Sequence, residues 1–321
     1  MTTYGDMLRH LGGLPVMAGI PFCKDSKYYF VDARNGSDGN DGLSPDSPLA
    51  TIIAAEAKMV ANRHDTLFII GTGTAIAMTA ALTWDKSHTH MIGITAPSHV
   101  AQRARITNED ATYTGLSPLF NVTATGCIFK NFYSFQGLAD ATALINWQVS
   151  GGRCYFENVH FAGGGHASNA INGCNSLRLV GSEGEHMFKH CTFGVDTIAA
   201  ATGVAALSIS GGTPRNWFQD CNFISYASAG GAMFVEWEAL SAVDRYMLFD
   251  RCRFINTGAT TIDSAFVIPA SVPSHRRVFL HDCQGYGFTD WEASNRGVLY
   301  ISGGTHTAGG YSGLFQASNA T

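Results

Sequence analysis

The sequence predicts an all-β protein folded as a right-handed parallel β-helix, a solenoid with three short strands in each coil. The main observation is a motif with a period of about 30 residues, the mark of a stacked-repeat fold. In each copy an apolar residue is followed by two polar residues and then a small or apolar one. The copies occupy 129–132, 156–159, 188–191, 218–221, 249–252 and 280–283. Their first residues lie 27, 32, 30, 31 and 31 positions apart.

The spacing within the motif predicts a corner. Side chains alternate along a strand, so Cys191 and Phe193 share a face that Phe188 cannot share on the same straight strand. The chain must therefore bend at the polar pair Lys189-His190, and Asn or Asp in such a pair tolerates the left-handed backbone that a corner can require. We expect like residues to stack in interior columns, which are Cys191, Cys221, Cys252 and Cys283, and Phe161, Phe193, Phe223 and Phe254.

A third strand precedes each corner. Leu177 and Leu179 recur 30 positions later as Leu207 and Ile209, and Gly-rich turns follow both pairs. A leucine-rich horseshoe is disfavoured because its Leu and Asn ladder is missing. Helical repeats are disfavoured because Gly and β-branched residues are frequent in the coils.

Four regions follow along the chain. Residues 1–22 fit no coil and form an N-terminal arm, and 23–65 form a cap for the first coil. In the cap, a strand at 28–31 and a tight loop at 32–42 precede a helix at 48–61, with Ser47 as N-cap and Pro48 as its first residue. The β-helix spans 66–304, and a tail rich in Gly, Ser and Ala spans 305–321. The arm residues expected to contact a partner are Tyr4, Met7, Leu8, Leu11, Leu14 and Val16.

Composition limits the partners. The net charge is −5 and no block of Lys or Arg occurs, so no nucleic-acid partner is expected. No apolar stretch approaches the length of a membrane span, and the first residues lack a signal-like apolar run. We therefore expect synthesis in a reducing cytoplasm. Charged residues make up only 14%, which fits either a surface covered in an assembly or a high content of turn residues.

The sequence predicts no metal and no cofactor. The Cys column lacks the close Cys pairs of zinc sites, and stacked side chains lie parallel rather than facing, so buried free thiols are expected. The loop at 32–42 resembles a calcium loop but lacks the acidic residue at its far end. The turn at 71–74 lacks the Lys and Ser or Thr of a nucleotide-binding loop.

Many β-helix proteins cleave polysaccharides, and the best candidate for catalysis is one edge that comprises Asp220, Asp250, Asp282, His190 and His281. A second carboxylate cluster, Glu236 and Glu238 beside Trp237, suggests carbohydrate binding, but a solvated rim is the favoured interpretation. Corners need polar turn formers in any case, and the residue type changes from coil to coil, whereas a catalytic site would gather its carboxylates in one coil. We therefore predict no catalytic residue, and a protein that is not an enzyme.

Several segments together resemble a known family. Residues 29–51 are similar to the opening segment of many right-handed β-helix proteins. Combined with 4–16, 90–97 and 211–216, they resemble a family of tailed-bacteriophage virion proteins encoded among head genes, over nearly the whole chain. The resemblance implies a structural protein without a catalytic motif.

The function expected from this resemblance is a capsid decoration protein. It would stand as a homotrimer on the outer surface of the virion head, with the arm on the major capsid protein or a sister subunit. The first alternative is a tail fibre or tailspike that binds or cleaves host surface polysaccharide, although no residue identifies a host glycan as partner. A cellular β-helix adhesin or lyase is disfavoured by the lack of a signal-like segment.

Overall fold

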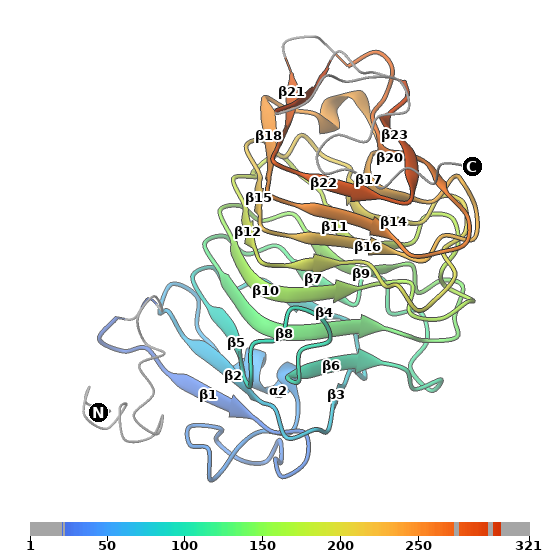
Figure 1. Cartoon of the computed structure of the whole chain (residues 1–321). Coiled ribbons are helices and arrows are strands. Elements are labelled where there is room, and N and C mark those ends of the chain that lie inside the picture. The colour runs from blue at the N-terminus through green and yellow to red at the C-terminus, as the bar shows by residue number, and fades with distance from the viewer. Residues whose placement is uncertain (1–20, 22, 273–275, 295–297, 303–321) are drawn as a thin grey trace.

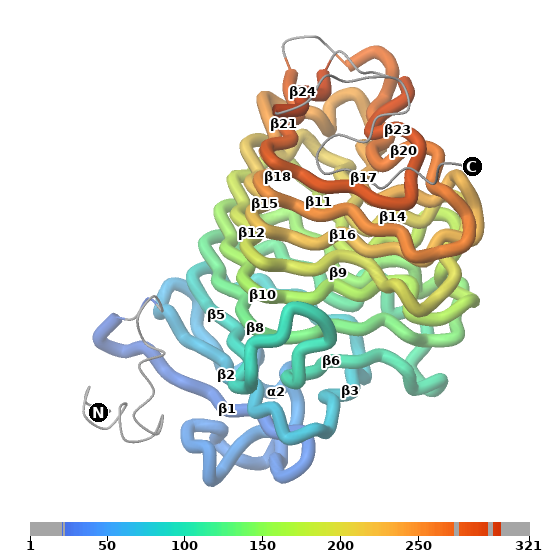
Figure 2. Tube along the Cα trace, in the orientation of Figure 1, coloured from blue at the N-terminus to red at the C-terminus, as the bar shows by residue number. Residues whose placement is uncertain are grey.

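A computed structural model describes residues 21, 23–272, 276–294 and 298–302, and it confirms the predicted fold class. The chain winds through successive coils that stack into a parallel β-helix (Figure 1; Figure 2). Every strand pairing between named strands is parallel. The predicted arm at 1–22 and tail at 305–321, with the six proposed arm contacts, lie outside the described residues, apart from Pro21.

Each coil contributes a first and a second strand to one sheet and a third strand to another. The first strands are β1 (Tyr28–Val31), β2 (Thr66–Ile70), β5 (His90–Ile94), β8 (Ile128–Gln136), β10 (Tyr155–Ala162), β12 (Met187–Lys189), β15 (Trp217–Gln219), β18 (Tyr246–Asp250), β21 (Arg277–His281) and β24 (Leu299–Ile301). The second strands are β3 (Ile76–Ala77), β6 (Arg105–Asn108), β13 (Thr192–Phe193), β16 (Asn222–Ser225), β19 (Arg253–Asn256) and β22 (Gln284–Tyr286). The third strands are β4 (Leu82–Trp84), β7 (Phe120–Val122), β9 (Ile145–Val149), β11 (Asn175–Leu179), β14 (Ala205–Ile209), β17 (Met233–Trp237), β20 (Ile262–Val267) and β23 (Phe288–Glu292).

The register places like residues over like. Phe188 pairs with Phe218, and Phe218 pairs with Phe249, so the first aromatic residue of the motif repeats directly above itself. On the third strands, Leu177 pairs with Leu207. Because the ladder bonds fix this register, one apolar residue at each position fills the interior along the whole stack.

In the first two copies of the motif, a single strand continues through the corner. The sequence predicts two strands separated by a corner, as in β12 and β13, whereas β8 and β10 each run through the corner as one strand. The reason is that β10 pairs with β8 on both sides of the corner residue, which leaves the ladder between them unbroken.

The N-terminal cap differs from its prediction in the helix bounds. The helix α2 spans Ile52–Lys58, and Thr51 rather than Ser47 is the N-cap, with its side chain accepting a hydrogen bond from the Ala54 N–H. Residues 47–50 cannot join the helix because Leu49 exchanges backbone hydrogen bonds with the chain of β1. Ile52 is fully buried against the first coil. A short 3₁₀ helix, Leu240–Ala242, lies between β17 and β18.

A small apolar cluster lies outside the main core. Phe30, Phe68 and Ile92 stack on the outer face of β1, β2 and β5. This cluster matters for the site described below, because Phe68 and Ile92 line it. Among the described residues, no helix has the length and apolar composition needed to cross a bilayer.

Candidate functional site

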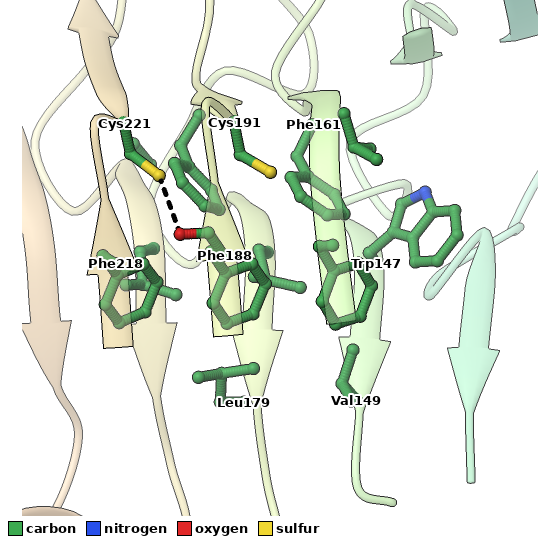
Figure 3. Close-up of a cluster of buried hydrophobic side chains, with 14 of the residues drawn as sticks. Trp147, Val149, Phe161, Leu179, Phe188, Cys191, Phe218 and Cys221 are labelled. Atoms are coloured by element: carbon green, nitrogen blue, oxygen red, sulfur yellow. Dashed lines mark hydrogen bonds between the residues drawn. The ribbon is translucent and has the colours of Figure 1, made fainter. Parts of the chain in front are cut away.

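The predicted interior columns lie inside the coils. Phe161, Phe193, Phe223 and Phe254 are fully buried, and successive rings stack with centroids 5.3, 4.7 and 4.7 Å apart. The four column Cys are buried free thiols, and Cys221 donates to the Phe188 carbonyl of the preceding coil at 3.5 Å (Figure 3). Burial raises the pKa of the Cys221 thiol, which keeps it protonated. These columns therefore act as packing.

The polar pairs form the predicted corners. The second residue of every pair has a positive φ, between 49° and 60°, which is the left-handed region. These residues are Asn131, Asn158, His190, Asp220, Arg251 and Asp282. The corners therefore place one polar residue per coil in a column along the rod. Of the edge residues considered for catalysis, His190, Asp220 and Asp282 lie in this column, and Asp250 and His281 directly precede it in their coils.

The N-terminal half of the column is a hydrogen-bonded network. The Asn158 side-chain amide donates to Asn131 Oδ1 at 2.8 Å, and the Asn131 side-chain amide donates to the backbone carbonyl of Gly93 at 2.8 Å. Lys130 and Glu157, the residues just before these corners, form an ion pair at 2.7 Å. Partial burial pushes the pKa of Glu157 up, but the hydrogen bond and charge of Lys130 outweigh it and lower the pKa.

The C-terminal half is a chain of ion pairs. Arg251 donates to both carboxylate oxygens of Asp220, at 2.8 and 2.9 Å, and to Asp250 at 2.9 Å. His281 lies 2.7 Å from Asp250 and 3.6 Å from Asp282. The hydrogen bond from Arg251 lowers the pKa of Asp220, and the hydrogen bond to Asp250 raises the pKa of His281. Asp250 is thus paired with two basic side chains, those of Arg251 and His281.

A segment without any repeat crosses the coils beside this column. Residues 95–104 connect β5 to β6, and they contact coils that come much later in the chain. The His99 carbonyl accepts from the Thr192 hydroxyl at 2.7 Å, and the Ala101 N–H donates to His160 Nδ1 at 3.1 Å. Gln102 donates to the backbone carbonyl of Asn158 at 2.9 Å. These hydrogen bonds hold the segment at 95–104 against the outer face of the second strands.

Between this segment and the corner column lies a groove of about 860 Å³. Its apolar lining is Phe68, Ile92, Ile94, Pro97 and Ile255, and its polar lining is Thr95, His99, Lys130, Asn131, Glu157, Asn158, His190, Asp220, Asn222 and Arg253, with Gly93 as well. We call this the corner groove. Of the predicted edge residues, His190 and Asp220 line it, whereas Asp250, Asp282 and His281 do not.

The groove offers hydrogen-bonding groups that the protein does not use itself. Within the described residues, the side chains of Asn222 and Arg253 have no hydrogen-bond partner. Glu157 and Asp220 are held ionised by Lys130 and Arg251, so they can accept hydrogen bonds but are poor proton donors. Two imidazoles, those of His99 and His190, line the groove from its two walls. Imidazole is the side chain most often used for proton transfer near neutral pH.

The second predicted carboxylate group lies on the other sheet, away from the groove lining. Glu238 pairs with Arg178 at 2.6 Å, and Trp237 is 2% exposed, so its ring is part of the core. Burial and the nearby Glu238 raise the pKa of Glu236; burial also pushes the pKa of Glu238 up, but Arg178 outweighs it and lowers the pKa. Because Trp237 is buried, it cannot stack on a sugar, and the outer face of β17 holds an ion pair instead.

Solved structures on the same fold are known. A pectin methylesterase in complex with a hexasaccharide matches with a TM-score of 0.53, at 14% identity over 91% of this chain and 94% of that one. The pectin methylesterase of Aspergillus niger matches with a TM-score of 0.53 and 13% identity over 89% of both chains. PemA from Erwinia chrysanthemi, also a pectin methylesterase, matches with a TM-score of 0.51 and 12% identity over 89% and 92%. No protein-family model and no curated protein sequence matches the chain.

This likeness corrects the prediction that the protein is not an enzyme. That prediction rested on the change of corner residue type from coil to coil, whereas the structures that share this fold over about nine tenths of their length are enzymes. At 12–14% identity the likeness shows the fold, so no residue of their sites is transferred to this chain. The parallel β-helix of this protein is a fold shared with enzymes that act on polysaccharides.

Sequence reasoning missed the corner groove. It located one wall, the column of polar corner residues, but not the segment at 95–104 that encloses it. That segment lies outside the repeat, and its contacts with Asn158, His160 and Thr192 join residues 56 to 93 positions apart. A usable signal was the long connection between β5 and β6, because long loops in repeat proteins gather on the binding face.

Proposed function

We propose that this protein binds a polysaccharide chain in the corner groove. The observation that carries the proposal is the groove itself, in which hydrogen-bonding side chains from successive coils face an apolar strip. Sugar rings present both kinds of surface, with hydroxyl groups around the edge and C–H groups on the faces. A mostly apolar lining with a few placed polar groups is typical of small-molecule sites.

The repeat of the groove suits a polymer. Successive coils lie about 4.8 Å apart, so the polar column offers one set of groups at that interval along the rod. A linear polysaccharide also repeats one unit along its length. The fold-level likeness to pectin methylesterases supports the same class of partner. The groove lining is balanced in charge, because Lys130 and Arg253 face Glu157 and Asp220, which favours a neutral or weakly charged glycan.

Cleavage of the bound chain is a second candidate function. The observation that favours it is the placement of His99 and His190 on the two walls of one groove. A group on each side of a sugar can give a proton to one oxygen while removing a proton from another. We expect His190 to be the more important of the two, because its corner lies in the coil between those of Glu157 and Asp220.

Of the functions expected from the sequence, this proposal corresponds to the tail fibre or tailspike alternative. The capsid decoration role rests on the family resemblance alone, and the comparisons lend it no support. The trimer, the contact with the major capsid protein and the place on the virion surface stay predictions. The arm residues assigned to that contact lie outside the described residues.

Binding is tested with a double substitution. Asn222→Ala with Arg253→Ala removes two unpaired groups of the groove without touching a corner. Probes are immobilised pectin, polygalacturonate, dextran and bacterial O-polysaccharides. We expect at least one probe to bind, and its affinity to fall roughly thirtyfold in the double variant, because two hydrogen bonds of about 1 kcal/mol each are lost. Gln148→Ala, a polar change on the opposite sheet, is the matched control.

Two results would contradict the proposal: no probe binds, or the double variant binds as well as the unchanged protein. Cleavage is measured on the probe that binds, by release of reducing ends. His190→Asn keeps a residue that tolerates the left-handed corner and should abolish turnover while leaving affinity within a few fold. If turnover persists in this variant, His190 has no part in the chemistry.

A further inference from the structure

A column of large apolar side chains runs along the outer face of the first strands. Each member pairs in register with the next, so the column rises straight along the rod. Its members are Tyr155, Met187, Trp217, Leu248, Phe279 and Tyr300. We call this the aromatic ladder. The strands that carry it, β10, β12, β15, β18 and β21, stand one above another along the left of the stack in Figure 1.

Three rings of the ladder are partly exposed, although Phe279 contacts the rings of Tyr246 and Tyr300 and the Arg277 guanidinium lies over the Tyr300 ring. Trp217 is 38% exposed, Phe279 37% and Tyr300 44%. The other Trp side chains, at 84, 147, 237 and 291, are at most 2% exposed. Single exposed apolar residues are common, but a contiguous row of them marks a surface that binds something.

The ladder adjoins the corner groove. The Tyr155 hydroxyl donates to Glu157 Oε2 at 3.1 Å, and Glu157 lines the groove. Trp217 belongs to the same coil as Asp220 and Asn222, which also line it. Phe279 lies in the coil after that of Arg253 and Ile255, the most C-terminal residues of the groove lining. The ladder therefore runs beside the groove and continues past its C-terminal end to Phe279 and Tyr300.

The size and spacing of the ladder favour a sugar chain over a second protein copy. An aromatic side chain has about 200 Å² of surface, so the exposed parts of Trp217, Phe279 and Tyr300 sum to roughly 240 Å². A stable interface needs roughly 800 Å² from each partner. The exposed rings of Trp217 and Phe279, together with the half-buried ring of Tyr155, occupy alternate coils, about 9.6 Å apart. That interval is close to the length of a disaccharide unit in an extended chain, which would place one sugar face on each ring.

We propose that the aromatic ladder is a second glycan-binding surface, on which polysaccharide segments that lie outside the corner groove stack. This inference rests on the proposed function of the groove. The C–H faces of sugar rings carry partial positive charge and are attracted to the negative faces of aromatic rings. Stacking tolerates different sugars. The ladder therefore increases the affinity for long chains, whereas the groove determines which polysaccharide binds.

The test compares long with short ligands. The double variant Trp217→Ala with Phe279→Ala removes two ladder rings, and Tyr226→Ala, an aromatic residue 39% exposed beyond the end of β16, is the control. Pectin, polygalacturonate, dextran and O-polysaccharide are each used as polymer and as disaccharide. We expect the double variant to lose about tenfold in affinity for the bound polymer and nothing for its disaccharide. Tyr226→Ala should change neither.

Fluorescence gives a second readout. Because Trp217 is the exposed Trp, acrylamide quenching of the protein reports mainly on that ring. Bound polymer should shield it from acrylamide, whereas the disaccharide should not. If the polymer binds and the Asn222 and Arg253 substitutions weaken it, but Trp217 stays open to acrylamide, the ladder proposal is wrong and the groove proposal stands.

Two further outcomes would overturn the inference. If no polymer binds at all, the proposed function of the groove fails, and the ladder proposal fails with it. If Trp217 becomes shielded as protein concentration rises without any sugar, and Trp217→Ala with Phe279→Ala turns an oligomer into a monomer by sedimentation velocity, the ladder is a contact between copies.

Discussion

The corner residues combine a backbone requirement with an exposed side chain. All six have a positive φ although none is Gly, and their side chains are Asn, Asp, His and Arg. Asn and Asp tolerate this conformation because their short side chains can hydrogen-bond locally, whereas a branched Cβ clashes with the neighbouring carbonyl. The corner therefore restricts which residues can line the groove. His190 occupies a corner although the left-handed backbone conformation costs a non-Gly residue a modest amount of free energy.

Substitutions at His190 separate the backbone requirement from the side chain. His190→Val should lower the free energy of unfolding by about 1–2 kcal/mol, because a β-branched residue strains a left-handed corner. His190→Asn should leave stability within about 0.5 kcal/mol. Urea denaturation followed by circular dichroism measures both. Equal stability of the two variants would show that the corner relaxes to another conformation.

Buried histidines make the stability of the protein depend on pH. Burial lowers the pKa of His160 and of His186 to about 4 and that of His90 to about 3, from an ordinary value of 6.5. Below pH 6.5 the unfolded chain takes up protons on these groups and the folded chain does not. Each histidine should therefore reduce the free energy of unfolding by about 1.4 kcal/mol per pH unit between about pH 6.5 and pH 4. Urea denaturation at stepped pH values measures the slope.

Two variants test whether His160 contributes to this pH dependence of the free energy of unfolding. His160→Gln removes one buried imidazole, so unfolding should become less dependent on pH between 6.5 and 4, whatever its effect at pH 7.5. Thr192→Val removes the nearby hydrogen bond to His99 but no titrating group, so it should lower stability equally at each pH. A slope that stays the same in His160→Gln would mean that His160 is protonated in the folded protein, contrary to its bonds with Ala101 and Gly194.

At the scale of the coil, stacked aromatic rings hold neighbouring turns together. Phe218 is fully buried, and its ring centroid lies 4.7 Å from those of both Phe188 and Phe249. Phe218→Ala should lower the free energy of unfolding by about 3–5 kcal/mol, because it opens a cavity between two coils. Trp217→Ala, one residue earlier on the outer face, should cost far less. Chemical denaturation compares the two, and similar losses would mean that the column is not the main contact between coils.

The coil was predictable from sequence because stacking demands like residues over like. The period, the corner at Lys189-His190 and the third strand around Leu207 all follow from that rule. The helix start was not predictable in the same way, since Ser47-Pro48 is a good local signal that Leu49 overrides by pairing with β1. The ladder did leave a signal, because a bulky apolar residue, such as Tyr155 or Trp217, precedes the first Phe of the motif.

Part of the candidate site escaped prediction for a different physical reason. The polar wall belongs to the repeat and could be located, including His190 and Asp220. The facing wall comes from a segment that occurs once, and its position is set by hydrogen bonds such as Ala101 to His160 that no local pattern records. Asp220 lines the groove and also pairs with Arg251, whereas Asp282, at the same corner position two coils later, lies beyond the groove lining.

At the scale of the whole molecule, each coil contacts mainly the coils beside it. Stability in such a stack is approximately a sum of coil terms and nearest-neighbour terms. The helix α2 covers the first coil, and its Ile52 side chain is fully buried. The cap therefore supplies the contacts that a preceding coil would otherwise provide. A substitution that weakens the cap should therefore destabilise the first coils most, with a smaller effect on coils farther along the rod.

Hydrogen exchange of two core variants tests this view of the rod. Ile52→Ala should speed amide exchange in β1 and β2 and leave β15 and β18 unchanged, because several coils separate them. Phe218→Ala should do the reverse, with the largest effect in β12, β15 and β18, the strands that pair around the cavity. Mass spectrometry of peptic fragments resolves these regions. If both variants speed exchange equally along the whole chain, the coils unfold as one unit. In that case binding of a polysaccharide in the corner groove would stabilise the entire rod, rather than the coils that it contacts.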